Sequence, residues 1–309
     1  MKRFLFLSFV VAVFSLAGNS QIYHYDVDGN GVVTAHDVTA LYDYLLGNLP
    51  AEPEATEYTV NGVTFKMIQV DAGTFTMGAT EEQGSDAYSD ESPTHQVTLS
   101  SFAIGQTEVT QELWVAVMGS NPSWFNGTGN PSHGSSHSDD CGINLLRPVE
   151  CVSWNDCQVF ISRLNQITGK NFRLPTEAEW EFAARGGNLS QGYKYAGSNN
   201  IDDVAWYGSN VSQESQFGVG GNGPKTVATK LSNELGLYDL SGNVAEWCQD
   251  KYGSYSAATQ TNPNGSVSGS EMVVRGGSWL RIPRLCRVSY RSHDEPTWYS
   301  ERVGLRLAQ

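Results

Sequence analysis

The chain has 309 residues, of which 39% are hydrophobic and 17% charged. With 8 Trp, 14 Tyr and 12 Phe, it has enough apolar surface for a large core, which excludes a fully disordered chain. The 33 acidic residues outnumber the 19 basic ones, and a net charge of -14 repels nucleic acid and anionic lipid. The 32 glycines predict a loop-rich fold, and five cysteines leave at least one thiol outside any disulfides.

Residues 1–20 have the pattern of a secretory signal peptide. A basic start, Lys2-Arg3, is followed by an apolar run over 4–17 and by small residues at 18–20. The apolar run falls short of the roughly 20 residues that span a bilayer, and no later stretch qualifies. We therefore expect an exported bacterial protein that is periplasmic, extracellular or attached to the cell surface. After cleavage it has no transmembrane segment and lies in a compartment that allows disulfides.

Residues 26–37 have the spacing of an EF-hand calcium loop, and apolar residues at helical spacing follow. Oxygen-bearing side chains stand at loop positions 1, 3, 5, 9 and 12, and glycine stands at position 6, where the chain must turn. The predicted ligands are Asp26, Asp28, Asn30, Val32 (through its carbonyl oxygen), Thr34 and Asp37. Residues 21–47 resemble half of a dockerin module, which implies a cohesin-like partner. A polar turn that holds no metal is the alternative.

Residues 47–56 combine Gly, Pro and acidic side chains without apolar periodicity, which predicts a linker over 48–56. Beyond it, residues 57–309 alternate short strand-like runs with long connections rich in glycine and asparagine. Strands are expected at 58–60, 65–70 and 96–99. This pattern predicts an irregular α+β domain.

Three helices are expected in this domain. The first begins at Thr110 and the second at Ser153, and in both an apolar stripe follows at helical spacing. The third begins with a capping box formed by Thr176 and Glu179. It ends at the glycines of 186–187.

A series of short motifs is spread over residues 57–309. They are Gly73-Thr-Phe-Thr-Met-Gly78, Glu91-Ser-Pro-Thr-His-Gln-Val97, Thr107-Glu-Val-Thr110, Pro148-Val149, Val152-Ser-Trp154, Arg173-Leu-Pro-Thr-Glu-Ala-Glu-Trp-Glu181, Gly236-Leu-Tyr-Asp239, Gly242-Asn-Val244, Glu246-Trp247, Arg275-Gly-Gly-Ser-Trp279 and Gly304-Leu-Arg306. In this order they resemble the formylglycine-generating enzyme, or sulfatase-modifying factor, family. The resemblance implies that family's variant of the C-type lectin-like fold. Because one fold can carry several functions, activity has to be argued from the site.

The oxidase site implied by this resemblance is incomplete. In the family, two cysteines just after the Gly-Gly-Ser motif bind copper(I), which prefers soft sulfur ligands. Cys286 matches the second cysteine, but Arg281 stands in place of the first, and a guanidinium cannot ligate a metal. The family's site tryptophan is Ala245 here. Ser278 keeps its position, although a plain loop hydroxyl is an equal reading. We expect no copper, with Cys286 and Ser278 as vestigial catalytic residues.

A second calcium site is expected before residue 247. Asp239 and Glu246 can place two carboxylates on one hard cation across the turn at Gly242. The family resemblance implies the same site, with ligands at Asp239, Gly242, Val244 and Glu246. A turn with a structural aspartate cap is the alternative.

The cysteines allow several pairings. Cys157 and Cys248 are the first choice for a disulfide, and Cys141 and Cys151 could close a second, local loop. Cys286 is then the unpaired residue, a buried apolar thiol.

The C-terminal part of the chain, from residue 280, alternates a regular frame with segments that follow no period. These segments, 280–285, 292–295 and 297–301, mix apolar, basic, acidic and aromatic residues as recognition surfaces do. The candidate ligand-binding residues are Arg281, Arg284, His293, Trp298 and Tyr299. The pattern is similar to variable proteins of diversity-generating retroelements, which display a diversified patch on this lectin-like fold. Ordinary loop drift in an inactive homologue is the alternative.

The sequence favours a secreted, non-catalytic, calcium-dependent protein that binds a protein or glycan ligand through its C-terminal loops. One alternative is a formylglycine-generating copper oxygenase that converts a sulfatase cysteine to formylglycine. Another is a structural subunit of a surface assembly that docks through residues 21–47. No nucleic-acid partner is expected.

Overall fold

The computed structural model of the chain describes residues 55–127, 143–211 and 223–309. The predicted signal peptide, the EF-hand loop 26–37 and most of the predicted linker lie outside these ranges, as does Cys141. No helix within the described ranges is both long enough and apolar enough to cross a membrane.

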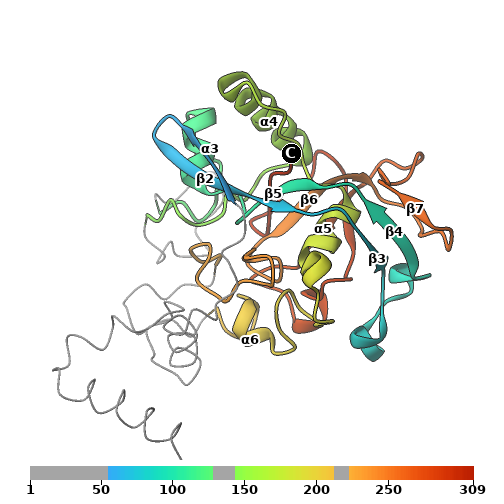
Figure 1. Cartoon of the computed structure of the whole chain (residues 1–309). Coiled ribbons are helices and arrows are strands. Elements are labelled where there is room, and N and C mark those ends of the chain that lie inside the picture. Colours follow the sequence, from blue (N-terminus) through green and yellow to red (C-terminus); the bar gives the residue numbers. More distant parts are fainter. Residues whose placement is uncertain (1–54, 128–142, 212–222) are drawn as a thin grey trace, which may run out of the picture. The chain divides into compact units, whose positions relative to one another are not determined.

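Three small sheets form the strand framework of the described domain (Figure 1). The first, in spatial order, contains β1 (Ala55–Val60), β2 (Val63–Val70) and β5 (Phe102–Gly105). The second contains β3 (Gly73–Met77), β4 (His95–Leu99) and β7 (Gln260–Thr261). The third contains β10 (Val303–Leu305), β6 (Ala245–Lys251), β8 (Met272–Arg275) and β9 (Ser292–Asp294). The strands expected at 58–60, 65–70 and 96–99 are confirmed as parts of β1, β2 and β4.

The three expected helices are confirmed, together with their N-terminal caps. They are α3 (Gln111–Met118), α4 (Trp154–Thr168) and α5 (Glu177–Ala184), and a short α6 (Ile201–Val204) was not predicted. Thr110 caps α3, and Ser153 and Thr176 form capping boxes at α4 and α5. Short 3-10 turns occur at Glu81–Asp86, Ser89–Glu91, Gly187–Leu189 and Pro283–Leu285. Helix, strand and loop segments are thus interleaved along the chain, as an irregular α+β domain requires.

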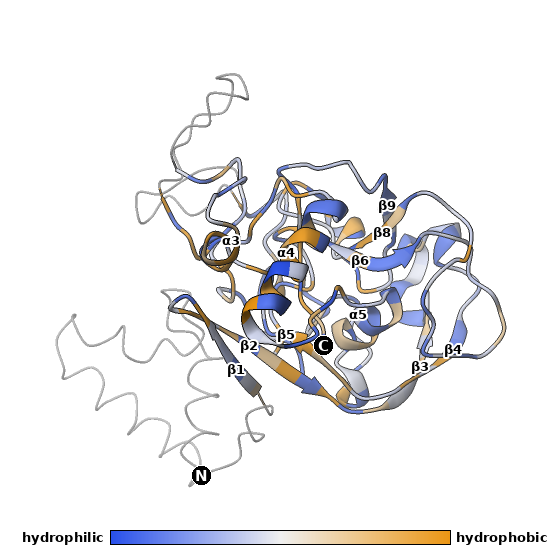
Figure 2. Ribbon diagram, turned by 90° about the horizontal axis from the view of Figure 1, so that it is seen from above, coloured by the Kyte–Doolittle hydropathy of each residue, from blue (hydrophilic) through white to orange (hydrophobic). Residues whose placement is uncertain are grey.

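Strand β6 separates the two largest hydrophobic clusters. Trp247 on β6 packs in one cluster with Phe160 of α4, whose alternating orange and blue residues in Figure 2 are typical of an amphipathic helix. The next residue, Cys248, belongs to the other cluster with Trp180 of α5. Successive residues of a strand point to opposite faces, so α4 and α5 cover the two faces of β6.

This alternation shows why the predicted disulfide is wrong. Cys157 and Cys248 are both free thiols with 0% exposure. Cys157 of α4 packs in the cluster that contains Trp247, whereas Cys248 points to the opposite face of β6. Cys151 is also a free thiol, which contradicts the expected local pairing.

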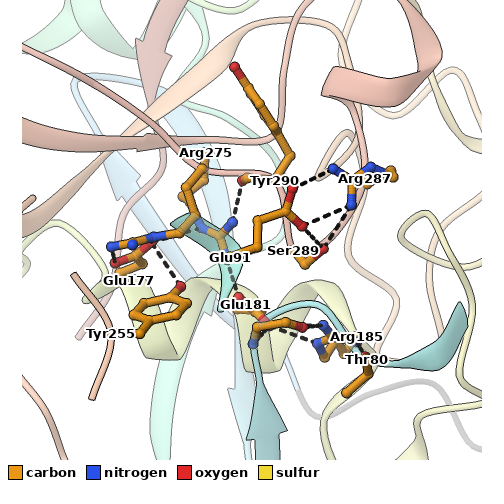
Figure 3. A network of polar contacts seen from close by, with 12 residues as sticks. Thr80, Glu91, Glu177, Glu181, Arg185, Tyr255, Arg275, Arg287, Ser289 and Tyr290 are labelled. Atoms are coloured by element: carbon orange, nitrogen blue, oxygen red, sulfur yellow. Dashed lines mark hydrogen bonds and ion pairs between the residues drawn. The ribbon is translucent and has the colours of Figure 1, made fainter. Parts of the chain in front are cut away.

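A buried set of ion pairs, the arginine–glutamate network, joins α5 to the chain after β8 (Figure 3). Glu181 accepts hydrogen bonds from Arg275 and, at 2.9 Å, from Arg185 Nε. Glu177, one turn earlier, accepts two bonds of 2.6 and 2.8 Å from Arg291. Both glutamates are buried, so each negative charge has an adjacent guanidinium in place of water.

Glu91, between β3 and β4, completes the network. Its carboxylate accepts bonds of 2.5 and 2.9 Å from Arg287 and one of 2.5 Å from Ser289 Oγ. Glu91 and Arg287 are both 0% exposed. Because a buried charge is tolerated only when it is paired, these contacts fix the segment after β8 to the rest of the domain.

Candidate functional site

A small cleft, the C-terminal cleft, opens beside β8 and β9. Its lining comes from β6, β8, β9 and the connections after β8 and β9, and includes Ser278, Arg281, Ser292, Asp294, Trp298 and Arg302. Ala245, at the position of the family's site tryptophan, also lines it.

Arg281 and Trp298, two of the five candidate ligand-binding residues, lie in this cleft. Tyr299 follows directly and is 53% exposed, outside the lining. The structure therefore brings two of the predicted side chains together and places the third next to them in sequence.

Arg284 and His293, the other two candidates, have different surroundings. Arg284 Nε donates to the Asp86 carbonyl oxygen at 2.7 Å, and its guanidinium lies 3.9 Å from the centre of the Tyr88 ring. The His293 ring stacks on Tyr252 at 3.9 Å between centroids. Both side chains fix loops together outside the cleft lining.

The cleft also contains residues that were missed as individual candidates. Ser292 and Asp294 of β9 line it, while His293 between them does not, as the twofold alternation of a strand requires. Arg302 lies opposite in the chain segment before β10. Ser292 and Asp294 could have been found from the sequence. They lie in the irregular segment 292–295, and in a strand the first and third residues point to the same face.

Of the two vestigial catalytic residues, Ser278 lines this cleft, whereas Cys286 packs in a hydrophobic cluster with Tyr195 and Tyr207. Cys286 is 0% exposed, and burial raises the pKa of its thiol to about 12, although Arg281 nearby acts in the opposite direction. The thiol is therefore neutral at pH 7, and it is the thiolate that ligates metals. The hydroxyl of Ser278, which is also buried, makes no hydrogen bond with the described residues. One neutral thiol beside a guanidinium does not fit a two-thiolate copper site.

Around the turn that precedes β6, the buried carboxylates outnumber the buried positive charges. Glu246 is paired with Arg306, with 2.8 Å between Oε1 and Nη2, and also accepts a bond of 2.7 Å from Trp180 Nε1. Burial, together with Asp239 and Glu246, holds the pKa of Glu108 well above its usual range. Three buried carboxylates therefore share the positive charge of Arg306.

Asp239 is the least satisfied of these carboxylates. Its Oδ2 accepts from the Ala228 backbone N–H at 2.8 Å, but its Oδ1 is buried without a hydrogen-bond partner in the described structure. Burial raises the pKa of Asp239 to about 6. The unpartnered oxygen of Asp239 fits calcium, which Gly242 and Val244 would also hold through their carbonyl oxygens, whereas both carboxylate oxygens of Glu246 are held by Arg306 and Trp180. A bound ion would supply structural charge compensation there.

In the described ranges, the turn before β6 included, no group of three or more His, Cys, Asp or Glu side chains is arranged as a metal site. The EF-hand residues 26–37 lie outside the described residues, so calcium binding there stays a prediction.

A second, more open pocket lies at the start of α5. Its lining includes Glu177, Asp250, Tyr255 and Arg291. Arg291 pairs with Glu177, and Tyr255 donates to the same carboxylate at 3.2 Å. Asp250 accepts a bond of 2.9 Å from the Glu177 backbone N–H. These polar groups satisfy one another, unlike those of the C-terminal cleft.

Comparison with known proteins agrees with the motif order. The family model described as "Sulfatase-modifying factor enzyme 1-like domain" matches residues 52–309. Over 273 residues the chain is 33% identical to "Chaperone protein LppX" of Paenibacillus barcinonensis, covering 80% of this chain and 90% of the relative. Over 288 residues it is 31% identical to "Formylglycine-generating enzyme" of Streptomyces coelicolor, covering 78% and 88%. The solved structure of Treponema denticola variable protein 1 matches with a TM-score of 0.69 at 33% identity, over 83% of this chain and 99% of that chain.

Proposed function

Because the chain belongs to the family of sulfatase-modifying factor enzyme 1-like domains, we propose that it uses this scaffold, in its C-type lectin-like form, to bind a ligand. The observation that carries the proposal is the composition of the C-terminal cleft. Arg281, at the position of the first copper-binding cysteine, lines the cleft, whereas the thiol of Cys286 is outside the lining and is buried with a raised pKa. A recognition surface needs neither a metal nor an activated nucleophile, whereas the family's oxidation needs two thiolates.

The names of two similar proteins are compatible with a non-catalytic role. One is a chaperone and one is a variable protein. The irregular segments 280–285, 292–295 and 297–301 supply side chains to the cleft or stand beside it. We infer that these segments contact a protein or glycan ligand outside the cytoplasm, as the signal-peptide pattern implies.

Calcium has a structural part in this proposal. The turn that begins at Asp239 leads directly into β6, which contains Glu246 and carries Ala245 at the cleft. Neutralising the buried carboxylates at that turn would stabilise the strand on which the cleft is built.

A binding experiment tests the proposal. The mature chain and a variant with Arg281→Ala, Trp298→Ala and Tyr299→Ala are applied to protein and glycan arrays. Ligands captured by the wild type should be lost by the variant and kept by Arg163→Ala, which removes an exposed arginine on α4. If the triple variant captures the same array ligands as the wild type, the proposal is wrong.

The alternative oxidase function has its own test. Anaerobic copper(I) titration and incubation with a Cys-x-Pro-x-Arg peptide in oxygen should give no high-affinity stoichiometric binding and no formylglycine. Formation of formylglycine product would overturn the non-catalytic reading.

A further inference from the structure

We propose that the C-terminal cleft recognises a carboxylate presented by a peptide segment of a partner protein. This inference rests on the proposed function and names the ligand chemistry of that same site.

Two guanidiniums in the cleft have unused donors. Arg281 is exposed, and its side chain makes no ion pair or hydrogen bond with the described residues. Arg302 uses only Nε, which donates to Ser300 Oγ at 3.2 Å and lies 3.4 Å from Glu301 Oε1. The terminal nitrogens of Arg302 therefore have no partner within the described structure. Guanidinium groups bind carboxylates through two parallel N–H bonds, which makes arginine the side chain suited to this ligand.

A third donor lies deeper in the same cleft. Ser278 is 1% exposed and lines the cleft, and its Oγ has no hydrogen-bond partner among the described residues. Its place is fixed by the two glycines before it: Gly277 has a φ of 71°, and a Cβ there would clash with the Leu285 carbonyl oxygen. A buried hydroxyl without a partner is costly unless a ligand atom satisfies it. A carboxylate oxygen is an acceptor that can do so.

The charge of the cleft selects an anion of low charge. Arg275 also lines the cleft, but it is committed to Glu181 and to the Tyr290 carbonyl oxygen. Arg302 is paired with Glu301, with 3.4 Å between Nε and Oε1, so Arg281 is the lining guanidinium without an ion pair in the described structure. Asp294 also lines the cleft, so the cleft carries little net charge. A singly charged carboxylate therefore suits it better than a doubly charged phosphate.

The surroundings of the cleft favour a peptide as the carrier of that carboxylate. Leu280 and Ile282 flank Arg281 in sequence and are 50% and 59% exposed, and Tyr299 beside Trp298 is 53% exposed. Exposed apolar and aromatic side chains around a central arginine are typical of protein interfaces, where the anchor is buried and the rim excludes water.

A peptide-display selection on the mature chain tests the inference. Random heptapeptides with a blocked C-terminus should yield binders in which an Asp or Glu is flanked by apolar residues. Replacing that acid by its amide should weaken the binder about tenfold or more, as loss of a charged hydrogen-bonded pair does. A parallel library with a free C-terminus separates a side-chain carboxylate from a terminal one.

Variants of the chain link these binders to the cleft. Arg281→Gln should weaken binding about tenfold or more. Arg281→Lys should weaken it less, because lysine keeps the positive charge but cannot donate two parallel N–H bonds to the carboxylate. Arg163→Gln on α4 is the matched control and should leave the affinity unchanged. Some peptides could bind the wild type, fail to bind Arg281→Gln, and still bind the wild type after their acid is replaced by its amide. Such peptides would overturn the carboxylate inference but would leave the proposed function supported. A selection with no binder that depends on the cleft would overturn the inference, and array ligands lost in the triple variant would still support the proposed function.

Discussion

The arginine–glutamate network and the C-terminal cleft are neighbouring regions that use the same residue type in opposite ways. In the network, Arg275, Arg287 and Arg291 each hold a buried glutamate. In the cleft, Arg281 has no partner and Arg302 keeps its terminal nitrogens without one within the described structure. The difference indicates that the network fixes the scaffold while the cleft keeps its donors for a ligand.

Arg275 connects the two regions. It lines the cleft, yet its guanidinium is held by Glu181 and the Tyr290 carbonyl oxygen, and it lies 5.1 Å from the centre of the Trp180 ring. One wall of the cleft is therefore fixed to α5.

The largest effect is expected from breaking the network. Glu91→Gln leaves Arg287 buried without its counter-charge and should lower the free energy of unfolding by about 3–5 kcal/mol. The matched control is Glu57→Gln, which removes an exposed carboxylate paired with Lys66 and should change stability by no more than about 0.5 kcal/mol. Urea denaturation measures both. Equal effects of the two changes would mean that the network does not hold the scaffold.

Asp250 provides a test by pH at the edge of the network, because it makes no ion pair with the described residues. Burial, with Glu177 nearby, raises its pKa to about 8 from the usual 3.8. The folded state then keeps a proton that the unfolded state has lost, so stability falls as the pH rises from about 4 to 8 and levels off above.

Asp250→Asn should remove this decline while its amide oxygen still accepts from the Glu177 N–H. We expect the variant to gain about 4 kcal/mol relative to wild type between pH 5 and pH 9. Melting temperatures at the two pH values measure it. If wild type and variant have parallel pH profiles, Asp250 is ionised in the folded protein.

Calcium removal should have a smaller effect. If the ion compensates Asp239 and Glu246, a chelator should lower the melting temperature of the wild type by several degrees, which corresponds to about 1–2 kcal/mol. Asp239→Asn replaces the carboxylate oxygen that has no hydrogen-bond partner. In this variant the chelator should lower the melting temperature by less than in the wild type. The EF-hand loop is the same in both proteins, so equal shifts would assign the calcium effect to that loop and not to the turn.

The smallest stability change is expected for Ser278→Ala, which tests whether the Ser278 hydroxyl donates to a ligand or supports the scaffold. Ser278→Ala removes a buried hydroxyl without a partner and should raise the stability of the free protein by up to about 1 kcal/mol. The same change should weaken ligand binding a few-fold. Lower stability with unchanged binding would show that Ser278 belongs to the scaffold.

Local signals allowed part of this structure to be predicted from the sequence. The caps at Ser153 and Thr176 are contacts between residues three apart, so their pattern is legible in the chain. Arg281 could be placed because it stands three residues after the Ser278 of the Gly-Gly-Ser motif. Family membership could be expected from the same short motifs.

Contacts between distant segments explain what the sequence could not predict. Arg284 and His293 looked like recognition residues because Asp86 and Tyr252, which hold them, lie in other parts of the chain. The pair of Glu91 and Arg287 is separated by 196 positions. The disulfide prediction failed for a related reason, since the face of β6 to which each residue points depends on register.

The central claim is that unpaired guanidiniums make the cleft a binding site, and a calorimetric titration tests it most directly. Its ligand is a selected peptide whose affinity is compared between wild type, Arg281→Gln and the α4 control Arg163→Gln. We predict that Arg281→Gln raises Kd about tenfold or more while the control leaves it unchanged. Equal Kd values in all three proteins would contradict the account.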